Sequence, residues 1–236
     1  MKVLVIPDVH LKPYMFEAAS NLMKQGVADC AVCLMDLADD WNMQYQIQLY
    51  EETYDAAICF AKRWPQTRWC YGNHDICYLW NERESGYSSM AADTVCRKLN
   101  ELSQALPEGN KISFIHRIDH VLFSHGGLSA WFVEEYVGKN LYEDADAVIE
   151  TINEFGPDLM WNDWSPLWYR PQFVKPRMYR PRTFLQVVGH TPVESITKKY
   201  NIISCDNFST YSDGRPIGKS EFLVVNTETW DYYGVK

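Results

Sequence analysis

Residues that could bind a metal ion or transfer a proton gather in one short stretch, RWCYGNHDICYL, at residues 68–79. A hydrophobic run ends there at Gly72, and an amide, an imidazole and a carboxylate follow at once at Asn73, His74 and Asp75. Side chains of these types rarely stand together in an apolar segment unless they bind one another or an ion. The stretch therefore predicts a functional site at the end of a strand.

The same pattern, a hydrophobic run followed by metal-ligand side chains, recurs along the chain. The groups follow five different predicted strands: Asp8 and His10; Asp36 and Asp39; Asn73 and His74; His125; and His190. Because ligands bind at the carboxyl ends of strands in α/β sheets, we expect these groups to share one rim. Their oxygen and nitrogen donors suit Mn, Fe or Zn. Asp36 could bridge two ions, which at about 3.5–4 Å apart could hold a bridging hydroxide and clamp a phosphoryl oxygen.

The elements that would position these residues alternate between strands and helices in the first half of the chain. Hydrophobic runs predict strands at KVLVIP, CAVCLM and TRWCYG, and helical periodicity predicts helices over 14–25, 42–64 and 89–106. Cys30 and Cys33 fall within the second strand, where positions three apart face opposite ways. We interpret them as small strand residues rather than as a redox or zinc pair.

The second half predicts strands in closer succession. KISFIH and HVLFSH predict a hairpin, a helix follows over 143–155, and TFLQVVG, NIISCD and EFLVVNTE predict three more strands. His116 and His120 fall in the hairpin and are interpreted as structural or exposed. Strand–helix repeats followed by successive strands predict an α/β layered sandwich with mixed sheets.

Residues 157–182 differ from the rest in being rich in proline, tryptophan and basic residues. Its prolines stiffen the chain, and it is too aromatic for a flexible linker. We therefore expect an ordered loop with local positive charge. Its characteristic residues are Pro157, Pro166, Pro171, Pro176 and Pro181; Trp161, Trp164 and Trp168; and Arg170, Lys175, Arg177, Arg180 and Arg182, against Asp158 and Asp163.

Bulk properties exclude several classes of protein. A chain of 236 residues with 47% hydrophobic residues predicts one large globular domain over 1–236. Its net charge of -9 argues against binding long nucleic acid through phosphates. No signal peptide or membrane-spanning run is recognisable, and seven scattered cysteines fit reduced thiols, so we expect a cytoplasmic protein that does not bind membranes.

The motifs DVH, DLAD, GNHD, SHGG and GHTP resemble, in order and approximate spacing, those of the calcineurin-like metallophosphoesterases. The resemblance runs from residue 3 to about 207. HGGLS and GHTP are most similar to the phosphoprotein phosphatase branch, which includes bacterial and phage phosphatases and diadenosine tetraphosphatases. The resemblance implies a four-layer α/β sandwich, with two mixed sheets flanked by helices. It also implies two divalent ions, with Mn the first choice and Fe, Zn, Ni or Co the alternatives.

The resemblance also implies a role for each matching residue. His74 would be the general acid that protonates the leaving oxygen, oriented by Asp39. Pro192 stands where many members of the wider superfamily have another histidine ligand, which agrees with the phosphatase branch. The implied metal ligands form two sets that share one residue: Asp8, His10 and Asp36 for the first ion, and Asp36, Asn73, His125 and His190 for the second.

Three positions depart from the family pattern. Leu11 and Met35 stand where the family has glycines, and Asp40 replaces an arginine that binds the substrate phosphate in relatives. A carboxylate at that position would repel phosphate. Arg170, in an LWYR element similar to one of bacterial relatives, is the expected substitute, carried by a lid-like insertion at about 157–182.

The leading hypothesis is a metal-dependent phosphoesterase in which a metal-bridging hydroxide attacks phosphorus directly and His74 protonates the leaving group. A phosphorylated protein side chain is the first-choice substrate, ahead of a dinucleoside polyphosphate or another small phosphoester. The alternative is a non-catalytic metal-binding interaction module derived from a phosphatase, which Met35 and Asp40 favour. All six expected ligands and the Asp39–His74 pair are present, which favours the enzyme.

Overall fold

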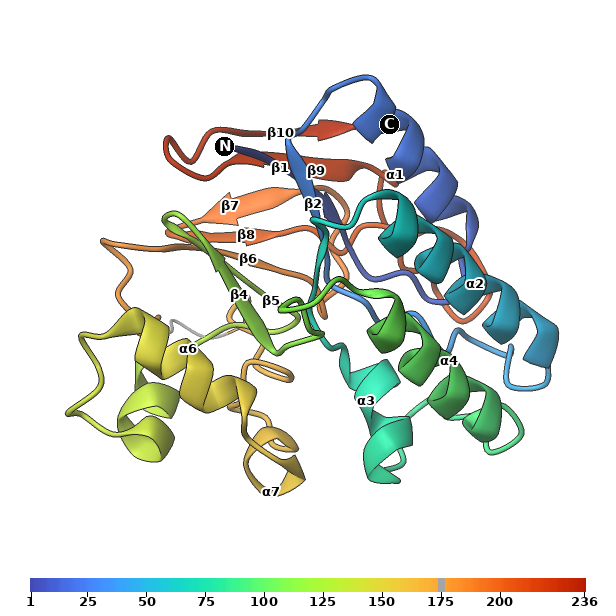
Figure 1. Ribbon diagram of the computed structural model, residues 1–236, viewed down its shortest axis with the longest axis horizontal. Helices are drawn as coiled ribbons and strands as arrows, with labels where there is room; N and C mark the ends of the chain where they lie inside the picture. The colour runs from blue at the N-terminus through green and yellow to red at the C-terminus, as the bar shows by residue number, and fades with distance from the viewer. Residues whose placement is uncertain (174–176) are drawn as a thin grey trace.

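The computed structural model describes residues 1–173 and 177–236, and its strands form two mixed five-stranded sheets (Figure 1). In the first sheet, the central strand β1 pairs in parallel with β2 and antiparallel with β9. This sheet has the order β10 (Tyr232–Val235), β9 (Phe222–Asn226), β1 (Lys2–Ile6), β2 (Cys30–Cys33) and β3 (Arg68–Trp69).

In the second sheet, three parallel strands are flanked by antiparallel partners. Its order is β4 (Ile115–Ile118), β5 (Val121–Ser124), β6 (Leu185–Val188), β8 (Ile202–Ser204) and β7 (Thr197–Lys199). The strand ends near the site belong to parallel strands. These are β1, β2 and β3 in the first sheet and β5, β6 and β8 in the second.

Helices cover the outer faces of the two sheets. In Figure 1, α1, α2 and α4 lie together on one side of the molecule, and α6 lies on the other, beside β4. The helices are α1 (Tyr14–Lys24), α2 (Ile47–Arg63), α3 (Asn73–Trp80), α4 (Ala92–Ala105), α5 (Ala130–Phe132), the π-helix η1 (Val133–Val137), α6 (Ala145–Asn153) and α7 (Pro157–Met160).

The residues of β1 show how the layers pack. Alternate side chains of a strand point to opposite faces of its sheet. Val3 and Val5 pack into the core between the sheets, where Phe123 and Val187 contribute from the second sheet. Leu4 and the other alternate residues pack instead against the helices. The order helix, sheet, sheet, helix confirms the predicted four-layer sandwich.

Some predicted boundaries were wrong. The helix predicted from residue 42 begins at Ile47, because Asn42 has a left-handed backbone (φ 61°) and its side chain binds another loop. The third strand is only two residues long, since the chain leaves β2 after Cys70 to bridge Ser113. The first hairpin strand begins at Ile115 rather than at residue 111. The helix α3 and the strands β7 and β10 were not predicted.

The interpretation of the two hairpin histidines is confirmed. His116 is structural, with Nε2 donating a hydrogen bond to the carbonyl of Trp69 (3.0 Å), and His120 is exposed. Cys30 and Cys33 belong to β2, and all seven cysteines are free of disulfide bonds. In the described residues, no helix has both the length and the apolar character to cross a membrane. Lys175 and Pro176, within the segment 157–182, lie outside the described residues.

Candidate metal centre

The six predicted ligands meet where the strand ends of both sheets converge. Asp8 and His10 follow β1, Asp36 follows β2, Asn73 begins α3 after β3, His125 follows β5, and His190 follows β6. All except His10 are buried, and His10 is partly exposed. The site therefore lies across the two sheets, with four residues from the first and two from the second.

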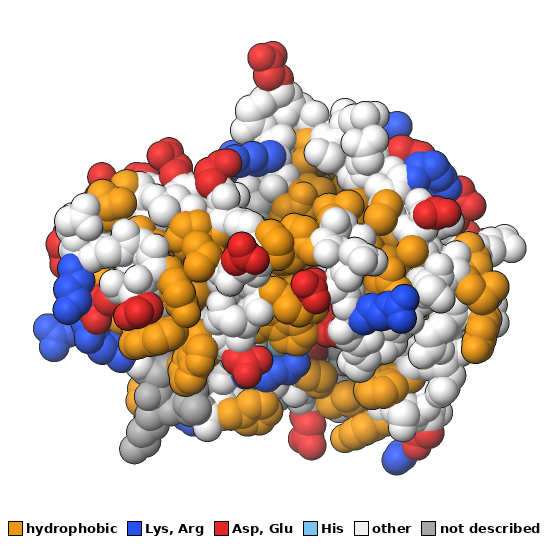
Figure 2. Space-filling view, turned by 90° about the horizontal axis from the view of Figure 1, so that it is seen from below, with side chains coloured by type: hydrophobic (Ala, Val, Ile, Leu, Met, Phe, Trp, Pro, Cys, Tyr) orange, Lys and Arg blue, Asp and Glu red, His pale blue; other side chains and the backbone are white. Residues whose placement is uncertain are grey.

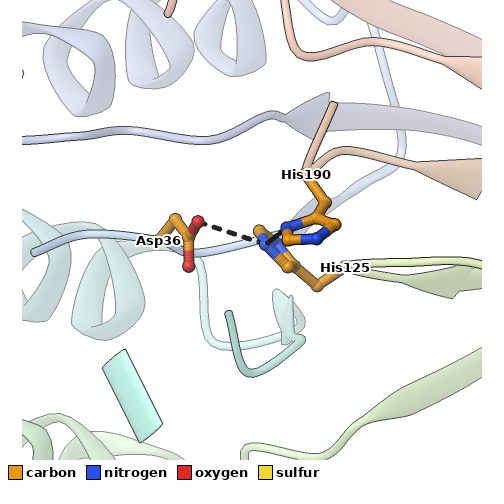
Figure 3. Close-up of side chains that lie close together, drawn as sticks. All are labelled: Asp36, His125 and His190. Atoms are coloured by element: carbon orange, nitrogen blue, oxygen red, sulfur yellow. Dashed lines mark hydrogen bonds and ion pairs between the residues drawn. The ribbon is translucent and has the colours of Figure 1, made fainter. Parts of the chain in front are cut away.

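The atoms of the second predicted ligand set converge on one point. Nε2 of His125 lies 2.9 Å from Oδ1 of Asn73, 3.1 Å from Oδ2 of Asp36 and 3.2 Å from Nδ1 of His190. Figure 3 shows the Asp36 carboxylate and the two imidazole rings pointing toward one another. Such a cluster of lone-pair donors suits a small divalent cation between them.

The first predicted set adjoins it through Asp36. Single donor atoms of Asp8, His10 and Asp36 all lie within 4.8 Å of one another. Oδ1 of Asp8 is buried and has no hydrogen-bond partner among the described residues. Buried polar atoms are rarely left unpaired in native proteins. This unpaired oxygen fits a residue that binds an ion.

Hydrogen bonds outside the cluster orient its ligands. Nδ1 of His10 donates to the carbonyl of Asp39 (2.9 Å), and Nδ1 of His125 donates to the carbonyl of Leu34 (2.9 Å). Each ring thereby presents Nε2 to the cluster, as outer partners of metal-bound histidines do. The Asn73 amide donates to Oε1 of Glu84 (2.6 Å), which turns its oxygen toward His125.

Two glycines make room for the carboxylates. A Cβ at Gly72 would lie 2.0 Å from Oδ1 of Asp36, and a Cβ at Gly189 would lie 2.0 Å from Oδ1 of Asp8. Both distances are far inside van der Waals contact, so neither position admits even alanine without displacing a ligand. The glycines of GNHD and GHTP thus act by their lack of a side chain.

The backbone at the site is locally strained. His10, Asp36 and His190 all have left-handed φ values, of 43°, 43° and 60°. Leu11 and Met35, the two positions at which the family pattern has glycine, both have φ 57°. A non-glycine residue in this region costs about 1–3 kcal/mol, and burial of both side chains helps to offset that cost.

The charges of the cluster perturb one another. Burial alone would raise the pKa of Asp36, but the charges of His125 and His74 lower it below its ordinary value. Burial likewise opposes ionisation of His125, yet Asp36 and Asp8 raise its pKa to about 9. Burial and the nearby Asp206 and Asp36 carboxylates raise the pKa of Asp8. A bound cation would replace the protons that balance these carboxylates.

His74 and Asp39 form the predicted pair beside this cluster. Nδ1 of His74 lies 3.0 Å from Oδ2 of Asp39, and the His74 backbone N–H donates to Oδ1 of Asp36 (2.9 Å). Burial would lower the pKa of His74, but Asp36 and the Asp39 hydrogen bond raise it to about 10. The hydroxyls of Tyr50 and Tyr78 donate to Oδ1 of Asp39 (2.8 and 2.6 Å), which fixes the carboxylate.

Sequence reasoning missed several polar residues of the site. Tyr50 and Tyr54 stand at the helical spacing that predicts α2, where they count as hydrophobic positions, but their hydroxyls bind Asp39 and Asp75. Asp75 also accepts from the backbone of Leu37 (2.9 Å), so it holds the loop that carries Asp36. Asp206 follows β8 beside His190, and its buried Oδ2 has no partner in the described residues. Its position at a strand end was the available signal.

Part of the segment 157–182 reaches the site. Trp168 and Arg170 line the cavity that contains the cluster, and the Trp168 ring meets the His190 ring edge-on. Arg170 donates to the carbonyl of His190 (2.6 Å) and to Oγ1 of Thr191 (3.2 Å). Gly126 lets this segment approach, because a Cβ there would lie 2.9 Å from the backbone of Tyr169.

Two other arginines of the segment 157–182 are engaged elsewhere. Arg177 pairs with Glu134, and Arg180 donates to the carbonyl of Glu143 (2.6 Å). Neither lines the cavity, which leaves Arg170 as its only Lys or Arg among the described residues.

Comparison with solved structures finds several proteins of similar fold. A cold-active protein-tyrosine phosphatase of a psychrophilic Shewanella species is 18% identical, with a TM-score of 0.58, over 100% of this chain and 80% of its own. A protein serine/threonine phosphatase from Saccharomyces cerevisiae is 15% identical, with a TM-score of 0.52, over 95% and 72%. A hypothetical protein from Pyrococcus horikoshii is 11% identical, with a TM-score of 0.51, over 100% and 87%. At these identities the likeness concerns the fold.

No curated protein sequence matches the chain. The model of one protein family, described as calcineurin-like phosphoesterase, matches residues 1–203. That range includes all six residues of the cluster as well as Asp39 and His74. The chain belongs to the calcineurin-like phosphoesterase family.

Proposed function

We propose that the protein is a dinuclear metal-dependent phosphatase that hydrolyses phosphomonoesters. The observation that carries this proposal is the pair of donor sets sharing Asp36, with His74 beside them in the same cavity. Asp8, His10 and Asp36 would hold one divalent ion, and Asp36 would hold the second with Asn73, His125 and His190. Divalent ions in such a site lower the pKa of bound water and neutralise charge on phosphoryl oxygens.

His74 and Arg170 would supply proton transfer and phosphate binding. His74, with Nδ1 bound to Asp39, has Nε2 free to donate a proton to the leaving oxygen. The reaction uses one water and no phosphoenzyme: the P–O bond to the leaving group breaks, and the products are an alcohol or phenol and inorganic phosphate. Arg170 would bind phosphoryl oxygens that the ions leave exposed, since its guanidinium can donate two parallel hydrogen bonds.

Charge favours a phosphomonoester over a dinucleoside polyphosphate. Arg170 is the only Lys or Arg lining the cavity within the described chain, and several carboxylates line it as well. A chain of phosphates would need further cations, which the cavity wall does not offer. On the face shown in Figure 2, Lys and Arg side chains are scattered and form no continuous stripe, which also argues against a nuclease.

The experiment that tests the function is a panel of phosphoesters assayed with Mn²⁺, Ni²⁺, Co²⁺, Zn²⁺ and Mg²⁺. Phosphotyrosine and phosphoserine peptides, a dinucleoside tetraphosphate and a bis-nitrophenyl phosphodiester represent the competing substrate classes. We expect hydrolysis of monoesters, with Mn²⁺ the most effective ion. Metal binding without hydrolysis of any ester would favour the non-catalytic module instead.

Replacing Arg170 tests its contact with substrate. Arg170→Ala should reduce kcat/KM by roughly ten-fold or more, equivalent to about 1.4 kcal/mol, and should weaken inhibition by inorganic phosphate. The metal content should stay unchanged. Arg177→Ala is the matched control, because that arginine lies in the same segment but pairs with Glu134 outside the cavity. Normal phosphate inhibition in Arg170→Ala would remove this residue from the substrate site.

A further inference from the structure

Two loops meet beside the metal centre and enclose part of its cavity. Residues 40–42 follow the Asp36–Asp39 loop, and residues 209–212 follow β8. The cavity has a volume of about 490 Å³, and its wall includes His74 and Arg170 as well as Trp41 and Tyr211. One continuous space therefore joins the proposed phosphate site to an aromatic wall.

Asp40 ties the two loops together. Its Oδ2 accepts a hydrogen bond from Nζ of Lys12 (3.0 Å), so its charge is balanced within the protein. Its Oδ1 accepts from Oγ1 of Thr210 (3.1 Å) and from the backbone of Trp41 (2.8 Å). Asp40 therefore joins the two loops. Because its charge is paired with Lys12, it should repel phosphate less than a free carboxylate would.

Two further hydrogen bonds between the loops hold Trp41 in place. The indole N–H of Trp41 donates to the carbonyl of Thr210 (3.0 Å), and the Asn42 amide donates to the carbonyl of Ser212 (3.0 Å). Trp41 is nevertheless 52% exposed, and Tyr211 is 48% exposed. Arg215 lies over the Tyr211 ring, 5.5 Å from its centroid. A large, fixed and half-exposed aromatic surface in a cavity wall is suited to stack against a planar group.

We propose that Trp41 and Tyr211 form a binding subsite for the aromatic leaving group of an aryl phosphomonoester, such as a phosphotyrosine side chain. This inference rests on the proposed function and specifies its substrate class. The phosphoryl group would lie at the metal centre and Arg170, with the neutral ring toward Trp41. Because no second Lys or Arg lines the cavity in the described residues, the part of the substrate beyond the phosphate should carry no further negative charge.

The reaction at this subsite balances with water alone. Water supplies the oxygen that joins phosphorus, the bond between phosphorus and the phenolic oxygen breaks, and that oxygen takes the proton from His74. One proton of the water stays on phosphate, and the other restores His74. The products are a phenol and inorganic phosphate, and no oxidant or further reactant is required.

The test compares the binding of phenylphosphonate and methylphosphonate, which are not hydrolysed, to the Mn²⁺-loaded protein by calorimetry. The native protein should bind phenylphosphonate about ten-fold more tightly, because ring stacking adds to apolar burial. Trp41→Ala should lose this preference and bind methylphosphonate normally, whereas Trp41→Phe should keep most of it. Tyr45→Ala is the matched control, since Tyr45 is 78% exposed in the same loop and does not line the cavity.

An unchanged preference in Trp41→Ala, or equal weakening of both phosphonates with native metal content, would overturn the subsite. Tighter binding of adenosine monophosphate than of phenylphosphonate through Trp41 would overturn the aryl assignment. In the peptide assay, the ratio of kcat/KM for phosphotyrosine over phosphoserine should fall about ten-fold in Trp41→Ala. A protein that binds phenylphosphonate through Trp41 but hydrolyses no ester would refute the proposed function and leave the subsite intact.

Discussion

Asp36→Asn should lose most of both metal ions and reduce kcat/KM by more than about 100-fold. Asp36 is the residue common to both donor sets, with Oδ2 3.1 Å from Nε2 of His125 and 3.8 Å from Nε2 of His10. An amide offers only one good ligand atom and no negative charge. Even outer partners of metal ligands change affinity or activity by about 10–100-fold, so a shared ligand should have a larger effect. Elemental analysis of protein purified with Mn²⁺ should fall from about two ions per chain.

Asp39→Asn is the matched control for this experiment. Asp39 is in the same loop and equally buried, but its carboxylate binds His74 and two tyrosine hydroxyls rather than the proposed ions. This variant should retain both ions and lose rate. Full metal occupancy together with full activity in Asp36→Asn would show that the dinuclear assignment is wrong.

His74→Asn should retain metal and lose rate in proportion to how much the leaving group needs a proton. Alkyl phosphates, which leave poorly, should lose roughly 10²–10⁴-fold in kcat, the usual contribution of a general acid. Nitrophenyl phosphate should lose much less, because nitrophenolate leaves without protonation. Steady-state kinetics on both esters, with metal analysis of the same samples, measures the difference.

His120→Asn provides the control for His74, because His120 is exposed at the hairpin turn away from the cluster. It should match the native protein on both esters. Equal losses on alkyl and nitrophenyl esters in His74→Asn would instead assign His74 a structural role, since its backbone N–H also binds Asp36.

The positions of the proposed ligands could be found in the sequence because each follows a hydrophobic strand. Strand ends are visible in a single sequence, and topology brings them to one edge. The structure accordingly places Asp36, His125 and His190 together, and places Asp8 and His10 beside Asp36. Whether they bind ions stays a prediction that the Asp36 experiment addresses.

Partners that lie on helices and loops could not be predicted in the same way. Tyr50 occupies an ordinary hydrophobic position in the periodicity of α2, and nothing local reveals that its hydroxyl binds Asp39. Glu84 lies in an irregular turn eleven residues after Asn73. The pairing of Asp40 with Lys12 joins residues 28 apart, so only the folded chain shows that this charge is compensated.

The position of the cluster across two sheets has a consequence for how the protein folds. Asp8, His10, Asp36 and Asn73 belong to the first 73 residues, whereas His125 and His190 arrive with strands of the other sheet. Strand β9 must then return from residue 222 to pair with β1, more than 200 residues earlier. Contacts this distant in sequence form slowly, because their loops must close first. The donor set proposed for the second ion, and with it the dinuclear site, can therefore be complete only after the two sheets have docked. Binding of the second ion would stabilise a nearly finished fold rather than nucleate it.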